Sequence, residues 1–240
     1  MEAVILDVDG TLADSERDGH RVAFNLAFEE FGLDHRWDVE QYGRLLEVTG
    51  GQRRLHAYLE AEGMDAAERE ELVPRLHARK TELFQELVAE GKVQPRPGTT
   101  ELLDRLEEEG VRLAVATTGS RGWVAPLLDR FFGLDRFEAI VAGDEAPARK
   151  PDPAAYVMAL EELRLPPSAA VAVEDSRSGL LAARAADLAC VVVVNDYTRD
   201  HDLEGAALVV DDFGALDVAT LRRLCDGDGE GGSGGGRRPA

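Results

Sequence analysis

Hydrophobic positions follow two different patterns along the chain, and the change between them divides it. Ala3 to Leu6 form a short, wholly apolar run, which is typical of a strand buried on both faces of a parallel sheet. From about Glu16 to Gly91 the apolar residues recur at three- to four-residue spacing, which predicts helices and no strand. These helices are expected near 22–31, 39–48, 53–62 and 66–89, with a kink or break at Pro74 in the last.

Beyond Gly98 the pattern becomes an alternation of strands and helices. Strands are expected at 111–116, 139–142, 170–173, 190–194 and 207–210, and helices at 99–109, 123–132, 153–163, 178–186 and 215–224. Such alternation is typical of a parallel sheet with helices on both faces. We therefore predict an α/β fold, a doubly wound parallel sheet that a helical insertion interrupts after the first strand.

This pattern predicts three parts of the chain. Residues 1–15 and 94–225 form the α/β core, to which the proline-rich linker Gln94-Pro95-Arg96-Pro97-Gly98 returns the chain. Residues 16–93 form a helical cap, because an insertion at the carboxyl end of a strand lies above the crevice where such sheets bind ligands. Residues 226–240 are too rich in glycine to pack, and we expect them to be disordered.

Charge and composition narrow the class of partner. The formal net charge of −20 argues against nucleic acid or a membrane surface as a partner, and no apolar run has the length of a membrane span. The two cysteines lie far apart and suggest neither a disulfide framework nor a metal knuckle. The first residues lack the basic region of a signal peptide. We expect a cytoplasmic protein that acts as a monomer.

Polar residues follow four of the predicted strands at the points where they end. Asp7 and Asp9 follow the first strand, Thr117, Thr118 and Gly119 the second, Lys150 the segment after the third, and Glu174 and Asp175 the fourth. Each of these residues alone is common in turns and at strand ends. Because the carboxyl ends of parallel strands meet at one edge of a sheet, however, we expect all of them to lie close together.

These residue types fit phosphoryl transfer. Carboxylates are the hard oxygen ligands that Mg²⁺ requires, and a bound dication removes the repulsion between carboxylates clustered at one strand end. Asp7 can attack phosphorus to form an aspartyl-phosphate, while Asp9 protonates the leaving oxygen and then takes a proton from water. Thr117 and Lys150 can hold the phosphoryl oxygens.

The stretches DVDGT, VATTGS, KPDP and EDS, in this order, resemble the four motifs of the haloacid dehalogenase superfamily. The resemblance covers about residues 1–225, and DxDGT is typical of its phosphatases and phosphomutases. It implies Asp7 as the nucleophile and Asp9 as acid and base, with the Asp9 backbone carbonyl as one ligand of Mg²⁺. The implied catalytic residues are Asp7, Asp9, Thr117 and Lys150, and the implied metal ligands are Asp7, Asp9, Asp175 and, as in some relatives, Glu174.

The cap stretches ERDGHRVAFN, WDVEQYGRLLEVTGG and HARKTELF are similar to the CbbY group, whose characterised members hydrolyse xylulose-1,5-bisphosphate, a misfire product of Rubisco. A bisphosphate would need cations in the cap for its second phosphate. The substrate-binding residues expected on this basis are Thr11, Glu16, His20, Arg44, Gly50, Gly51, Arg53, Lys80, Thr118 and Gly119. Gln52 stands where CbbY relatives commonly carry lysine, and Arg53 is a possible substitute.

The sequence leaves several functions open. The first is a Mg²⁺-dependent phosphatase of a small sugar phosphate, with xylulose-1,5-bisphosphate as the foremost candidate. A β-phosphoglucomutase-like phosphomutase or a phosphoglycolate phosphatase would build the same phosphoenzyme, so the motifs do not separate them. A non-catalytic binding module is a remote alternative. Degenerate relatives lose the nucleophile, the lysine or a metal carboxylate, and this chain keeps all of them.

Overall fold

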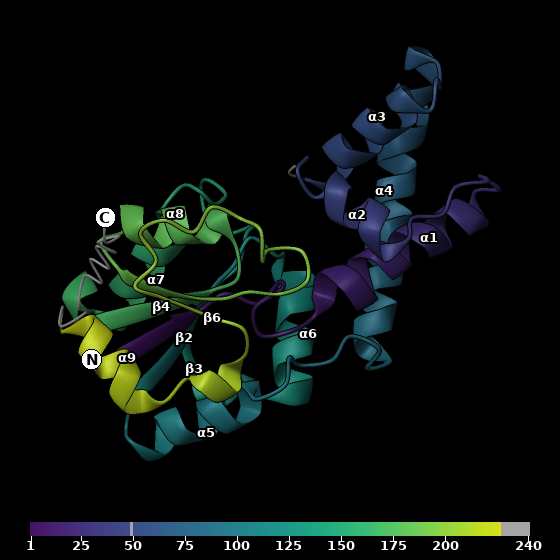
Figure 1. Ribbon diagram of the computed structural model, residues 1–240. Helices are drawn as coiled ribbons and strands as arrows, with labels where there is room; N and C mark the ends of the chain where they lie inside the picture. The colour runs from purple at the N-terminus through teal and green to yellow at the C-terminus, as the bar shows by residue number, and fades with distance from the viewer. Residues whose placement is uncertain (49, 227–240) are drawn as a thin grey trace, which may run out of the picture.

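One parallel sheet forms the centre of the protein (Figure 1). The computed structural model describes residues 1–48 and 50–226, so nearly all of the tail predicted to be disordered lies outside the described residues. The strands are β1 (Ala3–Leu6), β2 (Arg112–Ala116), β3 (Phe137–Val141), β4 (Ala170–Glu174), β5 (Ala189–Val193) and β6 (Leu208–Val210). Their order in the sheet is β3-β2-β1-β4-β5-β6, and every neighbouring pair is parallel. The predicted doubly wound fold is confirmed.

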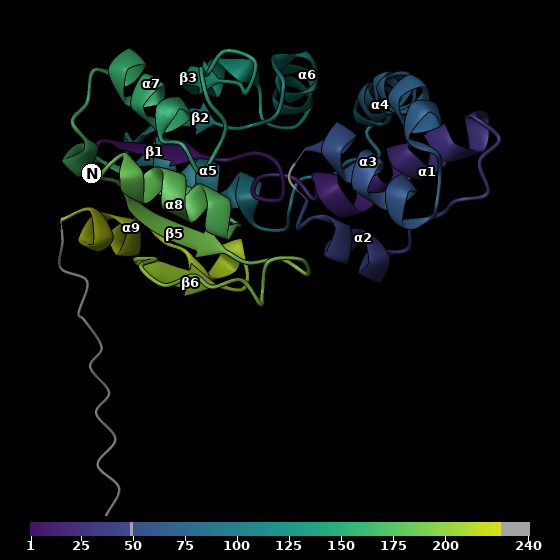
Figure 2. The same ribbon diagram turned by 90° about the horizontal axis from the view of Figure 1, so that it is seen from above.

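Helices cover both faces of the sheet (Figure 2). One face carries α5 (Thr99–Glu108), α6 (Arg121–Phe131) and α9 (Val218–Cys225), and the other carries α7 (Ala154–Leu163) and α8 (Arg177–Ala185). Successive side chains of a strand point to opposite faces, so Val4 and Leu6 pack with the first group while Ile5 packs with the second. This two-sided burial explains why β1 is apolar at every position.

The inserted segment is helical throughout its regular parts, as predicted. A π-helical turn (Glu16–His20) leads into α1 (Arg21–Glu30), which is followed by α2 (Val39–Leu45), α3 (Gly51–Ala61) and α4 (Ala66–Ala89). Figure 1 shows these helices grouped beyond the sheet, on the side where β1 ends. Aromatic side chains fill their interior, and the rings of Trp37 and Tyr58 meet edge to face with centroids 5.0 Å apart.

Of the kink or break expected at Pro74, the break is wrong. The helix α4 runs without interruption from Ala66 to Ala89. Proline deprives only the carbonyl of Glu70 of its helical donor, and both residues are exposed, so water can take the donor's place. The neighbouring Val73 and Leu76 are buried and hold this part of the helix against the rest of the segment.

Contacts between the helical segment and the core are concentrated at α4 and α6. The ring of Phe84 on α4 meets that of Trp123 on α6 edge to face, with centroids 5.0 Å apart. His20 lies against both rings, at centroid distances of 3.8 Å and 5.7 Å respectively. Among the described helices, none combines the length and apolar character that crossing a membrane requires.

Burial on both faces of the sheet makes the central strand sensitive to loss of methyl groups. We expect Val4→Ala, at a position with 0% exposure, to lower the free energy of unfolding by about 2 kcal/mol in urea denaturation. The same change in the edge strand, Val209→Ala, removes a side chain that is 45% exposed and is expected to cost less than about 0.5 kcal/mol. Equal losses at the two positions would contradict this account of the core.

Candidate active site

The ends of three strands meet at the ammonium group of Lys150. Its Nζ lies 2.6 Å from Asp7 Oδ1, just beyond β1, and donates a hydrogen bond of 2.8 Å to the carbonyl of Ala116, the last residue of β2. It also contacts Oε1 of Glu174, the last residue of β4. Lys150 itself lies in the loop between β3 and α7. The predicted convergence of polar residues at one sheet edge is therefore present in the structure.

Negative charge exceeds positive charge at this edge. Burial raises the pKa of Asp7 to about 7, and the charges of Glu174 and Asp9 add to the rise while Lys150 opposes it. Burial and the neighbouring carboxylates raise the pKa of Asp175 well above its usual value. Burial disfavours the charge on Lys150, but Asp7 and Glu174 outweigh this effect and raise the lysine pKa. The cluster therefore favours a further cation.

The carboxylates offer suitable ligands for a divalent cation. One oxygen from each of Asp7, Glu174 and Asp175 lies within 4.8 Å of the others, and carboxylate oxygens are the ligands that Mg²⁺ prefers. Glu174 is already engaged, because its Oε1 accepts from Lys150 and Tyr156 while its Oε2 accepts from the backbone N–H of Asp175. The side chains of Asp7 and Asp175 therefore fit such a cation best, and Glu174 fits the anchoring of Lys150 better.

Asp9 lies at the start of a chain of polar contacts that reaches the inserted helices. Its carboxylate accepts a hydrogen bond from Ser15 Oγ, and its Oδ2 lies 3.3 Å from His20 Nε2. Lys80 Nζ lies 2.8 Å from His20 Nδ1. A protonated lysine only donates, so Nδ1 accepts and Nε2 carries the proton that is donated to Asp9. Although burial opposes it, the contacts with His20 and Ser15 lower the pKa of Asp9.

A cavity of about 490 Å³ lies between the ends of the strands and the inserted helical segment, the predicted cap. This volume is in the usual range for a small-molecule site. The predicted residues that line it are Asp7, Asp9, Glu16, His20, Gly50, Gly51, Lys80, Thr118, Gly119, Lys150, Glu174 and Asp175. Burial lowers the pKa of Lys80 to about 8, which leaves it mostly protonated near neutral pH. The cavity thus has cations both in its core wall and in its cap wall.

Two predicted threonines lie beneath the cavity wall instead of in it. Thr11 and Thr117 are both fully buried. Thr117 Oγ1 accepts a hydrogen bond of 3.1 Å from the backbone N–H of Gly119, which holds the loop after β2. Thr118 and Gly119 in that loop face the cavity directly.

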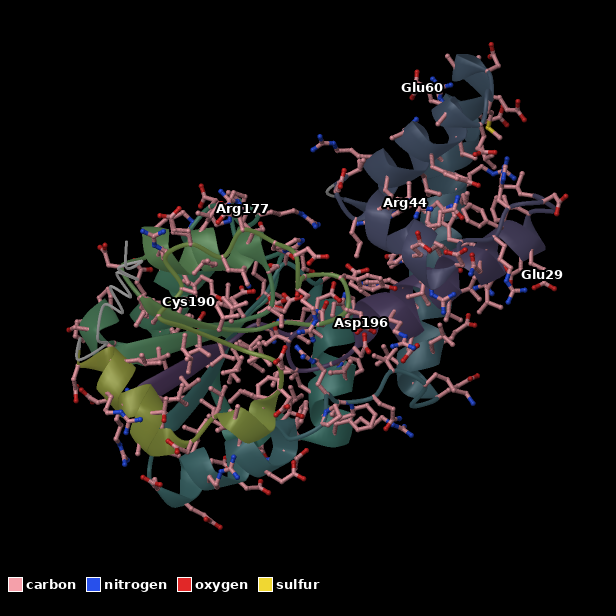
Figure 3. The ribbon with its side chains drawn as sticks, viewed as in Figure 1. Glu29, Arg44, Glu60, Arg177, Cys190 and Asp196 are labelled. Atoms are coloured by element: carbon pink, nitrogen blue, oxygen red, sulfur yellow. The ribbon has the colours of Figure 1, made fainter. Side chains whose placement is uncertain are left out.

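Two predicted arginines do not reach the cavity, and this is a correction. Arg44 is exposed on α2, where Figure 3 labels it, and forms an ion pair of 2.7 Å with Glu40 one turn before it. Arg53 is exposed in the first turn of α3. Successive residues of a helix point about 100° apart, so the inward position in this turn belongs to the next residue, Arg54.

Arg54 is the cap cation that sequence reasoning missed. It is 7% exposed and lines the cavity. Its Nε donates to the carbonyl of Leu45 at 3.0 Å, and its Nη1 donates to Tyr42 Oη at 3.1 Å. Tyr42 in turn donates to Glu16 at 2.6 Å. The periodicity of α3 carried a usable signal, because Arg54 lies one turn before the buried Tyr58 and so shares its face.

Sequence reasoning also missed two polar residues that hold the carboxylates. Tyr156 on α7 donates to Glu174 Oε1 at 2.7 Å, but its position in an apolar helical stripe gave no signal. Asn195, which follows β5, donates to Asp175 Oδ2 at 2.8 Å. Its place near the end of a fifth strand was a signal of the kind that identified the other site residues.

Comparison with known proteins gives a consistent assignment. Residues 1–187 match the model of a hydrolase family described as haloacid dehalogenase-like hydrolase. CbbY from Rhodobacter capsulatus is 43% identical over 227 residues, which cover 93% of this chain and 99% of that protein. A phosphoglycolate phosphatase from Pseudomonas fluorescens is 32% identical over 219 residues, 89% of this chain and 77% of the relative.

Solved structures of CbbY from Rhodobacter sphaeroides are also similar. One is a complex with phosphate, and another is a complex of a variant with xylulose-1,5-bisphosphate. Each matches with a TM-score of 0.81 and 42% identity, over 92% of this chain and 99% of the other.

Replacing Lys150 should reveal how much the burial of Asp7 and Glu174 destabilises the folded protein. We expect Lys150→Met to lower the free energy of unfolding by about 3 kcal/mol at about pH 7.5, because Asp7 and Glu174 lose their partner. Without that partner the folded protein binds more protons than the unfolded chain, so the loss should shrink as the pH falls to about 5.5. Urea denaturation of the wild type and of Lys150→Met at both pH values measures this loss in the free energy of unfolding.

Lys92→Met provides the control, since Lys92 is exposed and the substitution is the same. We expect it to change stability by less than about 0.5 kcal/mol. A loss in Lys150→Met that stays the same at both pH values would show that the carboxylates do not depend on this lysine.

Proposed function

This chain belongs to the haloacid dehalogenase-like hydrolases, and from that premise we propose that it is a Mg²⁺-dependent phosphatase of xylulose-1,5-bisphosphate. Family membership confirms the resemblance read from the motifs, together with the expected class of enzyme, a phosphoric monoester hydrolase. One observation carries the choice of substrate. The cavity has Lys150 beside Asp7 at its core end and the buried cations Arg54 and Lys80 in its cap wall, so it offers cations for two phosphates.

The proposed nucleophile is Asp7. One of its carboxylate oxygens forms a bond to phosphorus while the bond from phosphorus to the sugar oxygen breaks, which leaves an aspartyl-phosphate. Lys150 lies 2.6 Å from Asp7 and is placed to neutralise charge on the transferring phosphoryl oxygens. Thr118 and Gly119, in the loop after β2, line the same cavity and border the position proposed for those oxygens.

Asp9 is the proposed acid and base. In its protonated form it gives a proton to the departing sugar oxygen, and as a carboxylate it takes one from the water that attacks phosphorus and releases phosphate. The hydrogen bonds from Ser15 and His20 fix its position and favour its carboxylate form, which suits the second step. His20 connects this group to Lys80 in the cap, so substrate contacts there can influence Asp9.

The side chains of Asp7 and Asp175 would hold Mg²⁺, and the family resemblance adds the backbone carbonyl of Asp9. When bound, the ion neutralises the carboxylates and phosphoryl oxygens that meet at this edge. We further propose that residues 16–93 act as a cap over the core of 1–15 and 94–225. Phe84 and Trp123, which line the cavity where cap and core meet, then exclude bulk water.

Two alternative enzymes differ from this proposal in the fate of the phosphoryl group or in the substrate. A β-phosphoglucomutase-like enzyme would return the phosphoryl group to a sugar, and a phosphoglycolate phosphatase would act on a smaller acid. The similarity to a phosphoglycolate phosphatase at 32% identity keeps the second open. The cavity volume of about 490 Å³ and the two buried cap cations favour the larger, doubly charged substrate.

A phosphate-release assay tests the proposed function. We expect inorganic phosphate from xylulose-1,5-bisphosphate with a kcat/KM above that for 2-phosphoglycolate, and no glucose-6-phosphate from β-glucose-1-phosphate. Activity should vanish when Mg²⁺ is chelated and in Asp7→Asn, which lacks the nucleophile. Preferred turnover of 2-phosphoglycolate, or formation of glucose-6-phosphate, would assign the chain to an alternative enzyme. No Mg²⁺-dependent turnover of any phosphate ester would favour the binding module.

Adjacent arginines offer a matched test of the second phosphate site. We expect Arg54→Ala to raise KM for xylulose-1,5-bisphosphate about tenfold or more, because a charged hydrogen-bond donor is lost from the cavity wall. Arg53→Ala removes the same side chain from an exposed position and should leave KM unchanged. Steady-state kinetics on both variants measure KM, and thermal melts verify that both are folded. A larger increase in KM in Arg53→Ala than in Arg54→Ala would contradict the assignment.

A further inference from the structure

Asn195 lies just beyond β5, with one residue between them. It makes contacts that the proposed chemistry does not use. Its Nδ2 donates to Asp175 Oδ2 at 2.8 Å and lies 3.2 Å from the carbonyl of Gly10. Asp175 is one of the two side chains that fit Mg²⁺ best, and Gly10 belongs to the loop that carries Asp7 and Asp9. The amide of Asn195 therefore joins the two segments that would hold the cation.

The orientation of this amide is fixed by its other partners. Its Oδ1 accepts a hydrogen bond of 2.9 Å from the backbone N–H of Tyr197. A backbone N–H can only donate, so the oxygen must lie on that side and the NH₂ group must face Asp175. The backbone N–H of Asn195 is held as well, because it donates to Thr198 Oγ1 at 3.0 Å. The side chain is thus locked in the one orientation that supplies a donor to the carboxylate.

The carbonyl of Gly10 receives a second donor from the linker between cap and core. Arg96 Nη1 donates to it at 2.9 Å, and the same guanidinium donates to the carbonyls of Val193 and Val194. The end of β5 and the Gly10 loop are therefore tied together just beside Asn195. A Cβ at Gly10 would lie 2.5 Å from Asp175 Oδ2 and 3.2 Å from Asn195 Nδ2, so only glycine leaves room for this contact.

The hydrogen bond from Asn195 leaves the other oxygen of Asp175 available. In residues 1–48 and 50–226, Asn195 is the donor to the Asp175 side chain, and it engages Oδ2. A metal ligand requires an anchored carboxylate with one open oxygen, and hydrogen-bond partners of this kind orient the ligands in many metal sites.

We propose that Asn195 is a positioning residue that holds the Asp175 carboxylate in place for the divalent cation. The proposal rests on the Mg²⁺ dependence of the proposed function. The segment that carries Asn195 also touches the cap, since Asp196, labelled in Figure 3, pairs with Arg17 at 2.8 Å and the ring of Tyr197 lies 6.1 Å from that of Tyr42. Asn195 thereby acts on the cation site from a segment in contact with both parts of the chain.

Calorimetric titration of the substrate-free protein with Mg²⁺ tests this proposal. Asn195→Leu keeps the approximate volume of the side chain and removes its donor, and Asn195→Ala serves as a second variant. We expect the Kd for Mg²⁺ to rise about tenfold to a hundredfold in both. The increase in Tm on adding Mg²⁺ should shrink in parallel, and kcat lost at low Mg²⁺ should return as Mg²⁺ is raised.

Arg199→Gln is the matched control, because Arg199 lies in the same segment but is exposed and pairs with Asp211. We expect it to leave the Kd for Mg²⁺ unchanged. A folded Asn195→Leu or Asn195→Ala protein that binds Mg²⁺ as the wild type does would overturn the role of Asn195. A wild type that binds no Mg²⁺ would instead overturn the metal dependence on which the proposed function rests.

Discussion

The contact between one buried ammonium group and two buried carboxylates is the constraint on which the site depends. Lys150 meets Asp7 across 143 positions of sequence and meets Glu174 across 24. These distances close only because β1 lies between β2 and β4 in the sheet, so that three strand ends surround the lysine. Desolvation makes each of these charges costly alone, and their mutual contact offsets much of that cost. The strand order therefore determines which residues surround Lys150.

A single lysine does not balance the carboxylates that the strand ends bring together, and this excess of negative charge favours the proposed divalent cation. The raised pKa values of Asp7 and Asp175 record the excess of negative charge. The proposed divalent cation would remove this excess, with Asp7 and Asp175 as its ligands, whereas Glu174 and Asn195 would have other tasks. Glu174 holds the lysine, whereas Asn195 holds a carboxylate. The polar edge thus consists of the groups proposed to react and of groups that hold them in position.

The cap extends the same logic toward the substrate. Asp9 is connected through His20 to Lys80, and Glu16 is connected through Tyr42 to Arg54. Both chains start in or next to the loop after β1 and end at a cation in the cavity wall. In the proposed function, the cations for the second phosphate and the groups that react at the first would therefore share one hydrogen-bonded framework.

The sequence predicted the core better than the cap. A strand buried on both faces is apolar at every position, and polar residues at its end stand out, so the sheet and the placement of Asp7 and Lys150 could be foreseen. In the cap, the residue that faces the cavity depends on where a helix begins. α3 begins at Gly51, two residues before the predicted start, and Arg54 instead of Arg53 points inward.

Side-chain partners were harder to foresee than strand ends. The roles of Tyr156 and Asn195 depend on the register between segments distant in sequence, which local patterns do not encode. At Pro74 a local preference misled the prediction instead. Proline disfavours the interior of a helix, but packing of its buried neighbours outweighs this preference in α4.

The central claim is that the phosphoryl group passes through Asp7, and a quenched single-turnover reaction tests it most directly. The protein would be mixed with xylulose-1,5-bisphosphate radiolabelled in its phosphates, stopped with acid, digested and mapped by mass spectrometry. We expect a transient phosphorylated peptide that contains Asp7 and decays as phosphate is released. Release of phosphate without a labelled protein, or label on a residue other than Asp7, would contradict it.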